Sequence, residues 1–153
     1  DVDHKILDLL IDNSRIPFTD IAKKLLISAG TVHVRVKKME EFGIIKGASL
    51  ALDYKKLGYT FIAYIGIFLE KTHLTNYVLE KLDSIPYATV AHITTGRFNI
   101  FCKIRCKDTD HAKEIIFMID DIEGVSRTET MISLEESIND KKRLMHKIFN
   151  EIK

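Results

Sequence analysis

The 153-residue chain is long enough for one substantial domain or for two small ones. Its hydrophobic content of 46% and charged content of 29% are typical of a globular protein and argue against a disordered chain. The formal net charge of +1 conceals a local excess, because residues 23–46 carry six basic side chains against two acidic ones. A cationic patch on a nearly neutral protein predicts a specific anionic partner.

The sequence contains no run of about 20 apolar residues and no secretory signal, so we expect no membrane association and a cytoplasmic location. Its two cysteines, Cys102 and Cys106, fall in one predicted strand. Four residues along a strand separate them by roughly 13 Å, which is too far for a mutual disulfide. This use of cysteine agrees with a reducing compartment.

The first part of the chain predicts three short helices. Apolar residues recur at helical spacing over residues 3–11. Thr19 is suited to cap a second helix, and Ser28 is suited to cap a third that runs to Phe42 and stops at Gly43. Two short helices joined by a tight turn, after a first helix, are the outline of a helix-turn-helix.

The rest of the chain predicts a different class of structure. Residues 44–53 alternate loosely, as a strand or small wing would, and a linker over residues 53–59 follows. Strand and helix patterns then succeed one another as strand, helix, strand, strand, helix, strand, over residues 60–70, 74–85, 88–96, 98–106, 109–122 and 125–137. With right-handed crossovers, this order folds as a ferredoxin-like βαββαβ sandwich.

The predicted fold is therefore α+β with two domains. Residues 1–52 form an N-terminal helix-turn-helix domain of winged-helix-like type. Residues 60–153 form a C-terminal ferredoxin-like domain, in which residues 139–153 make a final helix.

The third predicted helix carries the cationic patch. When Val32, Val36 and Met39 face inward, hydrogen-bonding and small groups lie near the start of the outer face and cations lie farther along it. This matches the major groove, where residues near the helix start reach base edges and cations hold phosphates. The candidate DNA-binding residues are Ser28, Gly30, Thr31, His33, Val34, Arg35, Lys37 and Lys38. The alternative is a solvated helix face whose cations favour the negative end of the helix dipole.

The run "DHKILDLLIDNSRIPFTDIAKKLLISAGTVHVRVKKMEEFGII" resembles the DNA-binding domain of the Lrp/AsnC (feast/famine) transcription regulators. The later runs "LGY", "TTGRFNIF" and "TETMISL" continue this resemblance, so it covers nearly the whole chain. It implies sequence-specific binding of double-stranded DNA by a homodimer built on the second domain, often assembled further into an octamer, a tetramer of dimers. It also implies an amino acid as effector, with asparagine or another small amino acid as the candidates.

The segment "TTGRFNI", residues 94–100, reads from its residues alone as a hairpin turn in which Gly96 supplies the positive φ angle. In the family that it resembles, the corresponding loop lines the effector site. Backbone N–H groups near a glycine suit a carboxylate, whereas the ammonium needs acceptors. Asn99 stands where many family members have an acidic residue, and Ser126 where AsnC-like regulators have glutamine. The candidate effector-binding residues are Thr94, Thr95, Gly96, Arg97, Phe98 and Asn99, with Ser126, Thr128 and Thr130 on the last strand.

The first strand of the second domain, residues 60–70, is apolar on both faces, which predicts burial on both sides. A partner subunit would cover the second face, or the tail helix would cover it instead. The six histidines show no zinc-ligand spacing, and no nucleophile motif is present, so we expect no metal, no cofactor and no enzymatic activity. Two other functions fit the same pattern: an architectural protein that wraps DNA without an effector, and a ligand-binding enzyme subunit.

Overall fold

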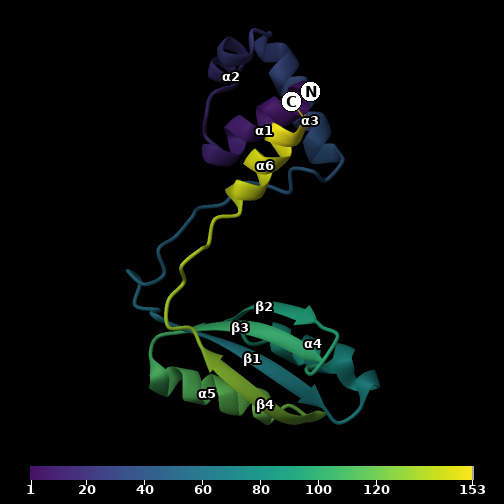
Figure 1. Cartoon of the computed structure of the whole chain (residues 1–153), viewed down its shortest axis with the longest axis vertical. Helices are drawn as coiled ribbons and strands as arrows, with labels where there is room; N and C mark the ends of the chain where they lie inside the picture. The colour runs from purple at the N-terminus through teal and green to yellow at the C-terminus, as the bar shows by residue number, and fades with distance from the viewer. Residues whose placement is uncertain (153) are drawn as a thin grey trace. The chain divides into compact units, whose positions relative to one another are not determined.

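The computed structural model describes residues 1–152 and divides the chain into two compact units (Figure 1). Unit 1 comprises residues 1–51 together with the tail from residue 137, and unit 2 comprises residues 52–136. In the part of the chain that the structure describes, no helix is long and apolar enough to cross a membrane.

Unit 1 contains the predicted helix-turn-helix. Helices α1 (Val2–Asp12), α2 (Phe18–Leu25) and α3 (Ala29–Glu41) pack around one small core. The turn between α2 and α3 contains Leu26, whose backbone is left-handed with φ 56°. Gly43, with φ 76°, follows the end of α3 as expected for a helix stop. The buried side chains of this core are Ile6, Ile21, Ala22, Val32, Val36 and Met39.

Two local expectations for unit 1 are wrong. The N-cap of α2 is Pro17 rather than Thr19, which lies inside the first turn of the helix. Residues 44–53 also form no strand. The backbone N–H groups of Ile44 and Ile45 both donate to the carbonyl oxygen of Met39, at 2.9 and 3.1 Å, so they close α3 instead of pairing with a strand.

The tail helix α6 (Lys142–Ile152) packs on α1 and so belongs to unit 1, although we expected residues 60–153 to form one domain. The imidazole of His146 lies between two α1 carboxylates, with Nδ1 2.5 Å from Oδ1 of Asp8 and Nε2 3.1 Å from Oδ1 of Asp12. Met145 lines an apolar cavity of about 380 Å³ together with residues of α1 and α3. The helical periodicity of the tail was visible in the sequence, but its partner was not.

Unit 2 has the predicted βαββαβ order. Strands β1 (Phe61–Leu69), β2 (Ala88–Ile93), β3 (Ile100–Cys106) and β4 (Val125–Ile132) form an antiparallel sheet in the order β2-β3-β1-β4. The short 3₁₀ helix η1 (Thr72–Leu74) and α4 (Thr75–Asp83) connect β1 to β2, and α5 (Thr109–Asp120) connects β3 to β4. The N-cap of α5 is Asp108, whose carboxylate accepts the backbone N–H of His111 at 2.8 Å.

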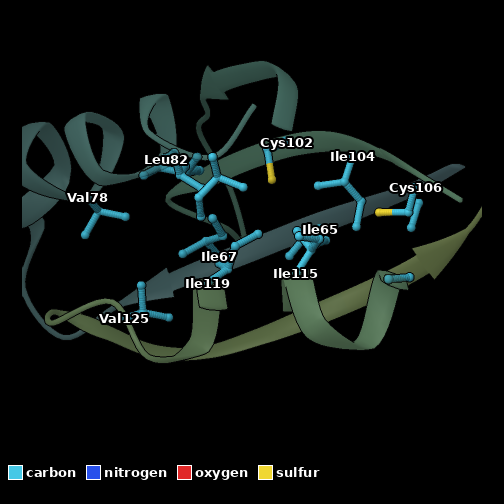
Figure 2. Close-up of a cluster of buried hydrophobic side chains, with 14 residues drawn as sticks. Ile65, Ile67, Val78, Leu82, Cys102, Ile104, Cys106, Ile115, Ile119 and Val125 are labelled. Atoms are coloured by element: carbon cyan, nitrogen blue, oxygen red, sulfur yellow. The ribbon is translucent and has the colours of Figure 1, made fainter. Parts of the chain in front are cut away.

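The core of unit 2 lies between one face of the sheet and the two helices (Figure 2). Alternate residues of β1 and β3 point into it, where they meet Val78 and Leu82 of α4 and Ile115 and Ile119 of α5. Both cysteines are in this core, and burial raises the pKa of each thiol to about 11. They are therefore structural side chains of low reactivity, and they form no disulfide.

The opposite face of the sheet also carries apolar side chains. On β1, Ile62, Tyr64, Gly66 and Phe68 alternate with the core residues and so occupy this second face. Phe101 pairs with Gly66 across β1 and β3, and its ring stacks on that of Tyr64 with the ring centroids 5.7 Å apart. Strand β1 therefore carries apolar side chains on both of its faces. We call this second face the open face of unit 2.

Candidate DNA-binding surface and effector loop

The start of α3 is a defined helix cap. The Oγ of Ser28 accepts the backbone N–H of Thr31 at 3.0 Å and lies 2.8 Å from its Oγ1. This contact leaves one fewer unsatisfied donor in the first turn, so the small polar groups at the helix start are held in place. Ser28 is therefore a capping residue whatever else it contacts.

The face of α3 opposite the core is exposed as expected. Val32, Val36 and Met39 are buried, and they anchor the inner stripe of the helix. The outer face presents polar and cationic groups to solvent, and the half-exposed Val34 lies among them. The ring of His33 also packs against that of Phe18 in α2, with centroids 6.0 Å apart. The exposed residues of the predicted set are Ser28, Gly30, Thr31, His33, Val34, Lys37 and Lys38.

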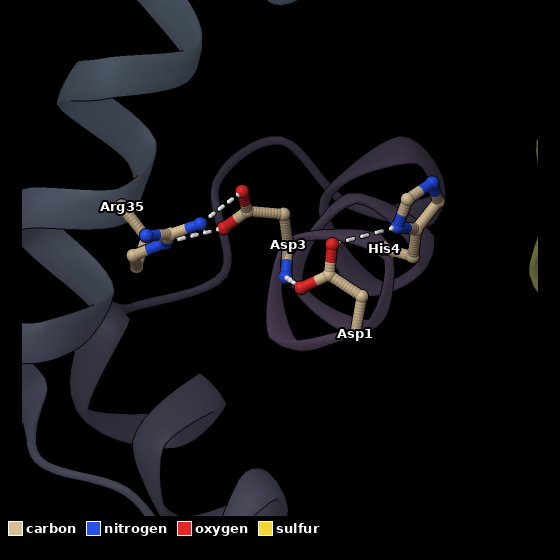
Figure 3. Close-up of polar contacts among 4 residues, drawn as sticks. All are labelled: Asp1, Asp3, His4 and Arg35. Atoms are coloured by element: carbon tan, nitrogen blue, oxygen red, sulfur yellow. Dashed lines mark hydrogen bonds and ion pairs between the residues drawn. The ribbon is translucent and has the colours of Figure 1, made fainter.

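Arg35 lies differently from the other cations of this helix. Its guanidinium reaches back to α1, where Nε donates to Oδ1 of Asp3 at 2.6 Å and Nη2 donates to Oδ2 of the same carboxylate (Figure 3). These hydrogen bonds hold the pKa of Asp3 below its ordinary value. Arg35, which the sequence predicted to bind phosphate, thus forms a bidentate ion pair with Asp3 of α1.

The predicted effector loop is a tight connection between β2 and β3. The backbone N–H of Thr94 donates to the carbonyl of Asn99 at 3.1 Å, and the Thr94 hydroxyl donates to the carbonyl of Phe98 at 3.0 Å. Gly96 has φ 93°, as the sequence predicted for the turn. The tip of the loop, residues 95–97, is exposed.

Asn99 and Ser126 both hold the end of β1. The amide oxygen of Asn99 accepts the backbone N–H of Leu69 at 3.0 Å, and the hydroxyl of Ser126 donates to the carbonyl of Phe68 at 3.1 Å. The pairing of β1 with β4 shifts register between Phe68 and Leu69, so both side chains support a bulge. The Asn99 oxygen, expected to accept from a ligand ammonium, is engaged with the backbone.

Thr128 and Thr130 do not join the loop residues. The hydroxyl of Thr128 hydrogen-bonds a carboxylate oxygen of Asp120 in α5 at 2.7 Å, so Thr128 faces the helices. Thr130 is two residues farther along the same strand and shares that face. Of the nine predicted effector residues, the structure brings together the loop and Ser126 but not these two threonines.

Phe98 ties the loop to the open face. Its ring lies over Gly66, where an added Cβ would overlap the ring carbons, and its centroid is 5.2 Å from that of Phe68 and 5.9 Å from that of Phe101. Gly66 was not predicted as a site residue. Its signal is a glycine within an otherwise apolar strand, which indicates close approach by another group.

The sequence also failed to reveal a charged side chain near the loop. Glu129 of β4 accepts a hydrogen bond from Arg97 at 2.5 Å and one from Arg127 at 3.3 Å. The hydrogen bond from Arg97 lowers the pKa of Glu129, so this group is a carboxylate at neutral pH. The register of β4 places it opposite Gly66, and that register could not be derived from the sequence. Within the described residues, no cluster of three or more metal-ligating side chains occurs.

Family models match both units. A winged helix-turn-helix DNA-binding domain matches residues 1–46, and the Lrp/AsnC ligand binding domain matches residues 62–142. Among curated proteins, the regulatory protein AsnC of Escherichia coli strain K12 is 38% identical over 138 residues, which are 90% of this chain and 91% of that protein. The AsnC of Haemophilus influenzae is 37% identical over 138 residues, covering 90% of this chain and 92% of its own.

Solved structures agree with these matches. The structure of E. coli AsnC superposes with a TM-score of 0.88 at 37% identity, covering 90% of this chain and 93% of that chain. A transcriptional regulator from Neisseria meningitidis, solved as an L-Met complex, shares the fold with a TM-score of 0.87 at 17% identity, covering 93% and 94% of the two chains. This chain is a transcription regulator of the Lrp/AsnC family, with a helix-turn-helix DNA-binding domain followed by an Lrp/AsnC ligand-binding domain.

Proposed function

We propose that α3 enters the major groove of double-stranded DNA, with Thr31, His33 and Val34 against the bases or nearby phosphates and Lys37 and Lys38 against the backbone. One observation carries this proposal: the inner stripe of α3 is buried while this entire face is exposed. The positions of small groups and cations along the helix suit the division between base and phosphate contacts. Such a regulator acts in the cytoplasm.

The proposed unit of binding is a homodimer. One helix-turn-helix makes few contacts, whereas two copies read two half-sites about one duplex turn apart. We propose that a second copy covers the open face of unit 2, where successive ring contacts join Tyr64 to Phe101, Phe101 to Phe98 and Phe98 to Phe68. Four such dimers would give the octamer that the family resemblance implied.

The proposed effector is a small amino acid, asparagine among the candidates, bound at the loop of residues 94–99. The pair Arg97–Glu129 supports this choice, because a zwitterion can place its carboxylate against the guanidinium and its ammonium against Glu129. The L-Met complex of the Neisseria relative supports an amino acid as the ligand class. The effector alters DNA binding only as far as its affinity differs between assembly states.

The DNA proposal is tested by gel shifts over a series of salt concentrations. Lys37→Ala should weaken binding to every duplex and lower the slope of log K against log salt by about 0.9, since one phosphate contact is lost. Lys113→Ala, an exposed lysine on α5, is the matched control and should leave the slope unchanged. Equal slopes for wild type and Lys37→Ala would contradict the phosphate role.

The effector proposal is tested by thermal unfolding in the presence of each of the twenty amino acids. A ligand at about 100 times its dissociation constant stabilises by about 2.7 kcal/mol, which is a shift of several degrees. Glu129→Gln should abolish that shift, while Glu135→Gln, an exposed carboxylate on the segment after β4, should retain it. If no amino acid shifts the transition while DNA binding persists, the protein is an architectural DNA-wrapping protein instead.

A further inference from the structure

The ion pair between Asp3 and Arg35 links two helices across 32 positions of sequence. Asp3 lies in the first turn of α1 and Arg35 lies in the middle of α3. The side chains are only partly exposed, 23% for Asp3 and 37% for Arg35. Two parallel N–H···O contacts fix the plane of a guanidinium as well as its position, which a single contact does not.

Asp3 is itself held in place. The carboxylate of Asp1 caps α1 by accepting the backbone N–H of Asp3 at 3.2 Å, and it also lies 3.4 Å from Nδ1 of His4 (Figure 3). The first turn of α1 is thus also held by contacts that do not involve Arg35. The Asp3 carboxylate also lies at the positive end of the α1 dipole, which favours its ionised form.

The position of Arg35 on the helix separates it from the other cations. At 100° per residue, Arg35 lies within about 70° of the centre of the buried stripe, while Lys37 and Lys38 lie on the outer half of the helix. Neither lysine forms an ion pair within the described residues, whereas Arg35 forms a bidentate ion pair with Asp3 through Nε and Nη2. Moving Arg35 to a phosphate would leave the Asp3 carboxylate without its guanidinium and would free the first turn of α1 from α3.

From this geometry we infer that Asp3 and Arg35 are positioning residues for DNA recognition, and that Arg35 does not bind phosphate. The pair sets the rotation of α3 about its own axis, so that His33, Val34 and Lys37 face outward together. This inference rests on the proposed DNA binding by α3. It assigns to Asp3, outside the recognition helix, an effect on affinity that no contact with DNA supplies.

The test is a double-mutant cycle with Asp3→Asn and Arg35→Gln in the full chain. The probe is a duplex selected by the wild-type protein from a random-sequence pool, titrated at several salt concentrations. Each single variant should weaken binding by about fivefold, and the double variant should be no weaker than either one, because both remove the same interaction. The salt slope should equal that of the wild type in all three. Exchange of the charges, Asp3→Arg with Arg35→Asp, should recover part of the lost affinity.

If Arg35 instead binds phosphate, the two single variants should change the salt slope and the affinity differently. Arg35→Gln would then lower the salt slope by about 0.9, and Asp3→Asn would leave affinity unchanged or raise it by freeing a cation. Either result overturns the inference. Circular dichroism of each variant at the assay temperature establishes that its helix content equals that of the wild type. Arg35→Lys, which keeps the charge but not the bidentate contact, replaces Arg35→Gln if that variant unfolds. If the wild type binds no duplex at all, the proposed function fails. If the wild type binds DNA but Arg35→Gln lowers the salt slope, or Asp3→Asn does not weaken binding, this inference alone fails.

Discussion

Leu26 lies in the turn of the helix-turn-helix with a left-handed backbone, φ 56° and ψ 45°, and with its side chain 90% exposed. For an L residue with a Cβ, this conformation costs about 1–2 kcal/mol. Because the side chain is almost fully exposed, it contributes little packing that would offset this cost. Leu26→Gly should therefore stabilise unit 1.

The magnitude follows from two opposing effects. Glycine relieves the backbone strain of about 1–2 kcal/mol, but its freedom in the unfolded chain costs about 0.4–1 kcal/mol. The expected net gain in the free energy of unfolding is about 0.5–1 kcal/mol. Leu26→Ala removes the same exposed side chain but retains the Cβ, so it should give no such gain.

Native-state hydrogen exchange of peptides from α2 and α3 measures this gain in the intact protein. Amides in these helices that exchange through opening of unit 1 should do so about two- to fivefold more slowly in Leu26→Gly than in wild type. Peptides of α4 and α5 in unit 2 serve as the internal control. Equal slowing by Leu26→Ala and Leu26→Gly would refute the argument, because the strained backbone would then not be the cause.

Three further outcomes are expected. Gly66→Ala should expel the Phe98 ring from the open face, so amide exchange in the loop of residues 94–99 should accelerate while unit 1 is unchanged. Ser28→Ala should destabilise α3 by about 1 kcal/mol through loss of its N-cap, and exchange of the first amides of α3 should report this loss. The hydrogen bond to Asp8 raises the pKa of His146 above its ordinary value, so the contribution of this contact is complete below that ordinary value and is lost as the pH rises through the raised one. Protection of α6 should accordingly fall with rising pH after correction for the intrinsic exchange rate, and His146→Gln should remove this dependence.

The sequence predicted those parts of the fold whose signal is local. Periodicity identified the helices and strands, and Ser28, Gly43 and Gly96 marked a cap, a stop and a turn because each residue type suits its backbone geometry. The order of elements then left few topologies for unit 2. The two apolar faces of β1 followed from simple alternation.

The sequence could not predict contacts between residues that are far apart along the chain. A helical wheel places Arg35 nearer the buried stripe than Lys37 and Lys38, but only the packing of α1 against α3 brings Asp3 to it. Glu129 reaches the effector loop through the register of β4, which a bulge shifts by one residue, and such a shift exchanges the faces of a strand. Thr128, a candidate effector residue, likewise has a partner that the sequence does not reveal, Asp120 of α5.

The return of the chain to unit 1 has a consequence for biosynthesis. Asp8 and His146 are 138 positions apart, so the contact between α1 and α6 closes only after residue 146 has left the ribosome. Helices α1, α2 and α3 leave the ribosome before unit 2, whereas α6, which packs on α1, leaves it after unit 2. A nascent chain can thus complete the sheet of unit 2 before α6 packs on α1, so unit 1 is completed only after the whole of unit 2 has been synthesised.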